Sequence, residues 1–204
     1  MQASPSAAVA PQTRPLRFSI GFYAAFVLCS VLIFPIHESA HYLAYRVYGI
    51  HVRMTLNTAS PADQSERKPL AELAWPVMNL AIAFGAALAY SKFPLHRMWW
   101  AALALASSMM RLVIYFLVSV AAIITGSGLR LGNDEPYAAH LWGIPALSLV
   151  ALLTIPFAVV VWSVVRTFRG SLRSKVLHVM GLGVATLVIG TVVSNVDPVL
   201  FPNR

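Results

Sequence analysis

The feature that most constrains the fold is a series of five long apolar runs joined by short polar connectors. The runs cover about residues 18–48, 70–91, 98–126, 143–168 and 175–200. The stretch from Phe18 to Ile36 holds no charged residue, and its 19 residues cross most of a bilayer core about 30 Å thick at about 1.5 Å per residue. Because no connector is long enough for a soluble domain, the sequence predicts an all-α polytopic membrane helix bundle with about five transmembrane helices.

The composition agrees with this class of protein. Hydrophobic residues make up 58% of the chain and charged residues 11%, with a mean hydropathy of +0.71, whereas a soluble domain carries about twice that charged fraction. The net charge of +8 comes from basic residues spread over the connectors without an aromatic-basic patch. We therefore expect the lipid bilayer as a partner and no nucleic acid.

The N-terminal segment and the single cysteine place only weak limits on the fold and the site. Residues 1–16 are rich in Ala, Pro, Ser and Gln, which is typical of a disordered tail, and residues 17–204 are predicted to form a single transmembrane domain. Cys29 is the only cysteine. The chain therefore forms no intrachain disulfide and no cysteine-based zinc site.

A short polar motif, His37-Glu38-Ser39-Ala40-His41, lies at the end of the first apolar run. On a helix, positions i and i+4 share a face, so His37 and His41 can present two imidazole nitrogens to one Zn²⁺ ion. Glu38 can reach a water molecule beside the metal and act as general base. If this chain's residues were placed at random, the expected number of such motifs would be roughly 0.003. We therefore interpret it as a zinc-hydrolase helix that is also a membrane helix.

The alternation of the runs limits which residues can meet this motif. We call the side of the membrane that holds the N-terminus side A and the opposite side B; the motif lies toward side B. The ends of the second, third and fourth runs that face side B bear the residues Glu72, Asn79, Asp134, Glu135 and His140, whereas His96 and His178 fall on side A. Eight basic residues on side A against six on side B leave the orientation of the chain in the membrane open.

A catalytic zinc site normally has three protein ligands and an open position for water. The third cannot be supplied six residues after His41, because that position is Val47. Asp134, in the segment Gly132 to Pro136 after the third run, is our choice for the third ligand, with Glu135 and His140 as alternatives. A simple Asn-Asp-Glu-Pro turn with a helix cap explains the same residues about as well.

Two polar residues inside the runs also need an explanation. Asn79 lies two to three turns inside the second run; it could hold an extended substrate backbone, or it could make an interhelical hydrogen bond. Arg111 lies near the middle of the third run, where a lone arginine normally faces the bundle interior with a partner. Glu38, Glu72 and backbone carbonyls are the candidate partners, and a structural ion pair is favoured over a catalytic role.

Taken together, these segments resemble the site-2 protease group of intramembrane zinc metalloproteases. The resemblance rests on His37 to His41, on Trp75-Pro76-Val77-Met78-Asn79, which is similar to the Gly-Pro-x-x-Asn element of that family, and on the acidic Asp134 after the third span. It implies a three-helix catalytic core over about residues 18–140 with two more helices behind it, over about residues 143–200. The chain departs from the family pattern at Trp75, where the family has Gly, and around Asp134, which is not in a Leu-Asp-Gly context.

The expected activity is zinc-dependent hydrolysis of a peptide bond in or near a transmembrane segment of a membrane protein substrate. The expected site consists of His37, His41 and Asp134 as zinc ligands, Glu38 as the catalytic base, and Asn79 as a substrate-binding residue. Two alternatives stay open: a zinc-dependent membrane hydrolase acting on a non-protein substrate such as a lipid amide, and a catalytically inactive membrane scaffold of the same fold.

Overall fold

The computed structural model describes residues 15–125 and 134–201, which form helices and one small hairpin. In chain order the elements are α1 (Ile20–Val47), β1 (Val52–Met54), β2 (Ala59–Pro61), the 3-10 helix η1 (Gln64–Glu66), α2 (Pro69–Glu72), α3 (Ala74–Lys92), α4 (Arg97–Thr125), α5 (Asp134–Trp142), α6 (Ala146–Val165) and α7 (Leu172–Leu200). Residues 1–14, most of the predicted N-terminal tail, lie outside the described residues.

Five helical segments of the described chain are long and apolar enough to cross a membrane. They are α1, α2 together with α3, α4, α6 and α7, with lengths of 20 to 29 residues. Their side chains are apolar on most of their surface, including the outward faces, as helices surrounded by lipid require. The predicted all-α polytopic helix bundle is therefore confirmed, with span ends that differ from the predicted ones by only a few residues.

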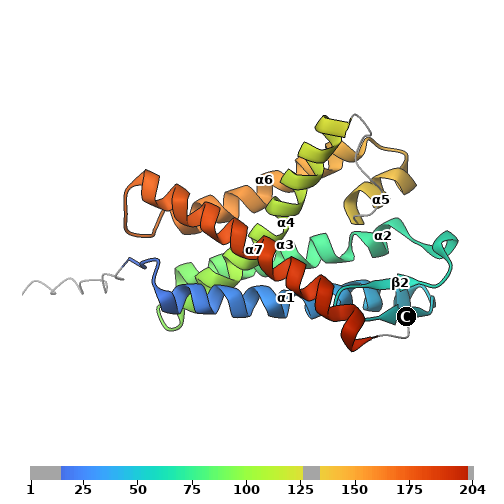
Figure 1. The fold of residues 1–204 in the computed structure, drawn as a ribbon, viewed down its shortest axis with the longest axis horizontal. Coiled ribbons are helices and arrows are strands. Elements are labelled where there is room, and N and C mark those ends of the chain that lie inside the picture. Colours follow the sequence, from blue (N-terminus) through green and yellow to red (C-terminus); the bar gives the residue numbers. More distant parts are fainter. Residues whose placement is uncertain (1–14, 126–133, 202–204) are drawn as a thin grey trace, which may run out of the picture.

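Helix α4 is the centre of the bundle and packs against α1, α3, α6 and α7 (Figure 1). Between Ala101 and Ser108 most of its side chains are small, and this stretch is buried apart from the half-buried Leu103. Small residues let helix backbones approach closely, which strengthens packing in a bilayer, where the hydrophobic effect does not drive helices together. This half of α4 therefore fixes the positions of α1 and α3, which carry the polar motifs.

The second span is broken near Leu73, between α2 and α3. Pro76 contributes to the break because it has no N–H to donate to the carbonyl of Glu72, one turn earlier. The short α2 packs against α5. The break brings the backbone of residues 71 and 72 to the end of the bundle where the His37–His41 motif lies.

Two connectors form regular structure that the sequence did not indicate. The connector after α1 holds the antiparallel pair β1–β2, with Arg53 opposite Ser60. The segment that starts at Asp134, predicted as a possible turn, is the nine-residue helix α5. Asp134 and Glu135 in its first turn favour a helix because carboxylates interact well with the positive N-terminal end; residues 126–133 lie outside the described chain.

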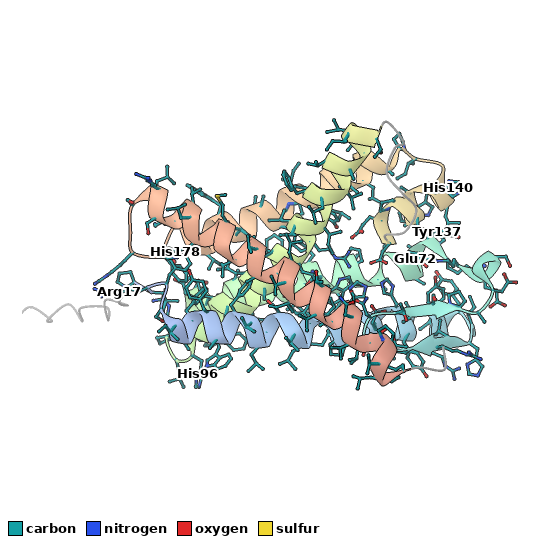
Figure 2. All side chains as sticks on the ribbon, viewed as in Figure 1. Arg17, Glu72, His96, Tyr137, His140 and His178 are labelled. Atoms are coloured by element: carbon teal, nitrogen blue, oxygen red, sulfur yellow. The ribbon has the colours of Figure 1, made fainter. Side chains whose placement is uncertain are left out.

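The two ends of the bundle are chemically distinct, as the alternation of the spans predicts. Figure 2 shows Glu72, Tyr137 and His140 at one end and Arg17, His96 and His178 at the other. Helix α7 crosses in front of α1 and α4 in Figure 1, and it packs against both.

Candidate metal centre

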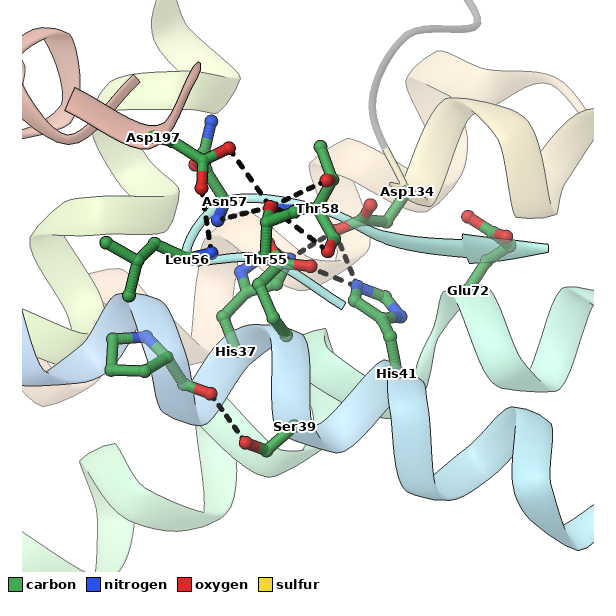
Figure 3. Close-up of polar contacts among 12 residues, drawn as sticks. His37, Ser39, His41, Thr55, Leu56, Asn57, Thr58, Glu72, Asp134 and Asp197 are labelled. Atoms are coloured by element: carbon green, nitrogen blue, oxygen red, sulfur yellow. Dashed lines mark hydrogen bonds and ion pairs between the residues drawn. The ribbon is translucent and has the colours of Figure 1, made fainter. Parts of the chain in front are cut away.

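His37 and His41 project from the same side of α1, one helical turn apart, beneath the turn of the β-hairpin (Figure 3). Their Nε2 atoms lie 3.1 Å apart. Ser39, between them, points to the other side of the helix, where its hydroxyl donates to the carbonyl of Pro35 at 2.7 Å. The i, i+4 spacing therefore does what the sequence predicts and brings two imidazole nitrogens together.

Asp134 supplies a third donor atom to the same point. Its Oδ2 lies 3.5 Å from the Nε2 of His37 and 3.4 Å from the Nε2 of His41. With the 3.1 Å separation of the two nitrogens, the three atoms form a nearly equilateral triangle. A tetrahedral zinc ion with bonds of about 2.0–2.1 Å has ligand atoms about 3.3–3.4 Å apart. The donor types and their separations therefore fit three ligands of one zinc ion, with a fourth position open.

The backbone of α2 fixes the ring of His41. Its Nδ1 donates to the carbonyl oxygen of Ala71 at 2.8 Å. Because a carbonyl oxygen only accepts hydrogen bonds, Nδ1 carries a proton, and in the neutral ring Nε2 then carries the lone pair that a metal ion needs. Histidines that bind metals typically have their second ring nitrogen held in this way. His41 is therefore oriented to bind a cation even before one arrives.

A buried ion pair holds the α2 carbonyl in place. Glu72, next to Ala71, accepts hydrogen bonds from the hydroxyl of Tyr45 on α1 and from Nε of Arg67 at 2.7 Å. The guanidinium of Arg67 also lies over the ring of Tyr137 on α5, 3.8 Å from its centroid. Glu72, which the alternation of the spans places on side B, thus connects the elements that carry His41 and Asp134.

Glu38 lies beside the triangle without being part of it. Its side chain is buried, with the residue 4% exposed, and its Oε1 is 3.6 Å from the Nε2 of His37. A carboxylate here can contact a water molecule that occupies the open fourth position. This is the arrangement expected of a general base that does not ligate the metal.

Arg111 of α4 contacts Asp134, one of the three candidate metal ligands, and the neighbouring Glu135. Its Nη2 donates to Oδ2 of Asp134 at 3.1 Å, and its Nη1 donates to Oε1 of Glu135 at 2.9 Å. Burial disfavours a charged Asp134, but His41, His37 and Arg111 together lower the pKa of its carboxyl well below the ordinary value. Asp134 is therefore a carboxylate, the form that binds metals. The predicted ion pair of Arg111 exists, with partners other than Glu38 and Glu72.

The ring of His37 has a different environment from that of His41. Its Nδ1 lies 3.3 Å from Nη2 of Arg111, which can only donate, and its ring centroid lies 4.6 Å from that of Trp75. This contact favours a proton on Nε2, so metal binding at Nε2 requires His37 to move that proton to Nδ1. Trp75, at the position of Gly in the similar site-2 protease element, packs directly against the candidate ligand His37.

A cavity of about 670 Å³ opens in front of the three donor atoms. One wall is polar and comes from the hairpin and the C-terminal half of α7: Asn57, Thr58, Ser60, Thr191, Ser194 and Asn195. Other lining residues are apolar and come from α1, α4 and α7: Phe34, Met110, Val113, Ile114 and Leu187. The cavity in front of the three donor atoms is therefore lined by both polar and apolar side chains.

Asp197, near the end of α7, joins this helix to the hairpin turn (Figure 3). Its carboxylate accepts from the backbone N–H of Leu56 at 2.8 Å and from the hydroxyl of Thr55 at 3.0 Å. Asp197 is not among the residues that were predicted to meet the motif. It could have been included, because alternation of five spans places the end of the fifth on side B.

The remaining candidates from the sequence lie away from the triangle. Asn79 is fully buried, donates to the carbonyl of Ser107 on α4 at 2.7 Å and does not line the cavity. This geometry favours the interhelical hydrogen bond, and substrate binding by Asn79 stays a prediction. Glu135 is fully buried in its pair with Arg111. His140 is exposed at the end of α5.

Comparison of the chain with protein-family models, curated proteins and solved structures finds no match. The geometry of the site is therefore the basis for assigning a function.

Proposed function

We propose that this chain is a multi-pass, membrane-embedded zinc metalloendopeptidase that hydrolyses a peptide bond in or near a transmembrane segment of a protein substrate. The observation that carries the proposal is the triangle of His37 Nε2, His41 Nε2 and Asp134 Oδ2, with sides of 3.1–3.5 Å, beside the buried carboxylate of Glu38. This combination of donors and base is the one used for metal-assisted hydrolysis.

The proposed chemistry divides between the metal and the chain. When bound, zinc lowers the pKa of a coordinated water toward about 7 and polarises the carbonyl to be cleaved. Glu38 takes the proton of the attacking water and returns it to the leaving nitrogen. The carbonyl of Ala71 holds His41 in the required tautomer.

The position of the site supports a membrane substrate. Two of the three donor atoms belong to α1, which is long and apolar enough to span a bilayer, and the cavity that the donors line also contains apolar residues of α1, α4 and α7. The amides of a substrate helix are already paired, so the substrate must unwind locally before its carbonyl can reach the site. The polar wall offers partners for the peptide groups that unwinding exposes.

The similarity of residues 37–41 and 75–79 to motifs of site-2 proteases points to the same activity. A membrane hydrolase of non-protein substrates and an inactive scaffold are the competing assignments. Stoichiometric zinc distinguishes both hydrolases from the scaffold, and the kind of product distinguishes the two hydrolases from each other.

The test uses the full chain in lipid vesicles with a set of single-span peptides that carry helix-breaking residues at different depths. We expect new peptide termini, found by mass spectrometry, with the wild-type chain and none with Glu38→Gln. The matched control Glu66→Gln changes an exposed glutamate of the connector and should cleave like the wild type. Equal cleavage by Glu38→Gln, or no cleavage of any peptide by a zinc-loaded chain, contradicts the proposal.

A further inference from the structure

Arg111 is a buried cation in the interior of a membrane-spanning helix. It is 2% exposed, and it lies in the same span as the small-residue stretch that fixes α1 and α3. A charge at such a position is costly unless it is paired, and it usually has a function. The catalytic chemistry proposed above does not use it, so its role needs a separate explanation.

The two arms of the Arg111 guanidinium contact two neighbouring carboxylates at the start of α5. Nη1 reaches Glu135 at 2.9 Å and Nη2 reaches Asp134 at 3.1 Å. Arginine can serve both because its donors form a rigid planar fork, whereas a lysine ammonium is a single point charge. One side chain of α4 thus sets both the position of α5 and the direction of the Asp134 carboxylate.

The contact to Glu135 is reinforced from the same face of α4. Tyr115, one helical turn after Arg111, donates its hydroxyl to the same Oε1 of Glu135 at 2.6 Å. Glu135 is fully buried and therefore anchors the N-terminal end of α5 to α4. Asp134, the preceding residue, is then carried to the histidines of α1.

We propose that Arg111 is a positioning residue of the metal centre: it holds Oδ2 of Asp134 over the Nε2 atoms of His37 and His41 and anchors α5 through Glu135. This inference rests on the proposed function, since it assumes that the three atoms bind zinc. It extends that function by assigning the geometry of the third ligand to a side chain of a different helix.

Whether zinc affinity falls or rises when Arg111 is removed distinguishes a positioning role from a purely electrostatic one. A positive charge beside the site repels a zinc ion, so a purely electrostatic Arg111 weakens zinc binding and its removal tightens it. A positioning Arg111 orients a ligand, so its removal weakens binding, by about 10–100-fold if it behaves like other groups that orient metal ligands. When zinc binds Nε2 of His37, Nδ1 of His37 carries a proton, so Nη2 of Arg111 can no longer donate to it. The two contacts of Arg111 with carboxylates do not depend on that proton and are kept.

The experiment measures zinc affinity of the full chain in detergent by competition with a chelator. Removing Arg111 alone leaves Glu135 as an unpaired buried charge, which strongly destabilises a fold. The main variant is therefore the double substitution Arg111→Gln with Glu135→Gln, which removes the pair together. Arg111→Lys is the second variant; it keeps the charge but reaches only one carboxylate. Arg53→Gln is the control, because it removes an exposed arginine of β1.

We expect zinc affinity to fall about 10–100-fold in the double variant, to fall less in Arg111→Lys, and to stay within a few-fold of wild type in Arg53→Gln. The visible absorption spectrum of Co²⁺ bound in place of zinc should change in the double variant, because it reports the ligands around the metal. Unchanged or tighter zinc binding with an unchanged cobalt spectrum overturns the positioning role. If the double variant does not fold, Arg111→Lys decides by the same two measurements.

His37→Ala, measured in parallel, separates this inference from the proposed function. Loss of zinc in His37→Ala with normal binding in both Arg111 variants contradicts the positioning role alone. A wild-type chain without zinc, or a His37→Ala variant with wild-type affinity, contradicts the metal centre itself and the role of Arg111 with it.

Discussion

The Nδ1 atom of His41 donates a hydrogen bond to the carbonyl oxygen of Ala71 at 2.8 Å. This contact joins α1 to the short helix α2. In the neutral ring of His41 it leaves the lone pair on Nε2, which lies 3.4 Å from Oδ2 of Asp134. The break between α2 and α3 thus has a chemical consequence: it supplies a backbone acceptor that selects the metal-binding tautomer of a histidine.

The two histidines should be indispensable for zinc binding. His37→Ala and His41→Ala each remove one of three protein ligands, so each should lose most of the bound zinc. Metal analysis of the purified variants measures this. The matched control is His140→Ala, which removes an exposed histidine at the same end of the bundle and should retain wild-type zinc. Full zinc content in both ligand variants would show that the motif is not the site.

Asp134 should behave as a ligand. Asp134→Ala should reduce zinc affinity by more than the roughly 10–100-fold that is typical of groups behind the ligands, and it should reduce peptide hydrolysis to the same extent. Zinc titration and turnover of one preparation measure both effects. Asp63→Ala, at an exposed aspartate of the connector, should change neither. An effect no larger than that of the Arg111 variants would remove Asp134 from the coordination of the metal.

Glu38 should separate metal binding from catalysis. Glu38→Gln keeps the shape of the side chain but cannot accept a proton, so the variant should bind zinc normally and lose hydrolysis. Zinc stoichiometry and peptide cleavage, compared with Glu66→Gln, test this pair of expectations. Normal turnover in Glu38→Gln would remove the base from the account, and loss of zinc would instead make Glu38 a ligand.

The sequence predicted the fold class and the point at which the site lies, for identifiable reasons. The apolar runs give the spans directly, and their alternation places His41 and Asp134 on one side of the membrane although they are far apart in the chain. The i, i+4 spacing of His37 and His41 needs only a helix. These features depend on local patterns and on one topological rule, so no knowledge of packing is required.

The contacts that complete the site could not be derived in this way. Arg111 pairs with Asp134 and Glu135 because α5 is a helix that docks on α4, whereas the sequence was equally consistent with a turn. The hairpin has short strands and no strong turn signal, and its link to Asp197 spans 141 residues. Each of these contacts depends on the tertiary arrangement, which local propensity does not determine.

Asp197 should hold the hairpin turn over the cavity. Asp197→Ala removes the acceptor for the N–H of Leu56 and the hydroxyl of Thr55, and hydrogen bonds to charged groups contribute about 1.5–3 kcal/mol each. Hydrogen exchange at the amide of Leu56 should therefore become faster, while exchange in the helical core of α4 stays unchanged. Asp197→Asn keeps an acceptor oxygen and should show a smaller effect. Unchanged exchange in Asp197→Ala would show that the turn is held by other contacts.

Zinc removal should destabilise the folded chain. A ligand that binds only the folded state at 100 times its Kd stabilises by about 2.7 kcal/mol, so a chelator should lower the thermal midpoint of the wild type and of Glu38→Gln. The same treatment should leave His41→Ala unaffected, because that variant has little zinc to lose. An equal shift in all three chains would show that the chelator acts elsewhere.

The central claim is that His37, His41 and Asp134 bind one zinc ion. X-ray absorption at the zinc edge on the full chain in lipid tests it most directly, with Asp134→Ala measured beside the wild type. The account predicts one zinc per chain with two imidazole nitrogens at about 2.0–2.1 Å and a carboxylate oxygen at about 2.0–2.2 Å, and loss of that carboxylate oxygen in whatever zinc Asp134→Ala retains. A wild-type chain without stoichiometric zinc, or a spectrum without two imidazoles, would contradict it.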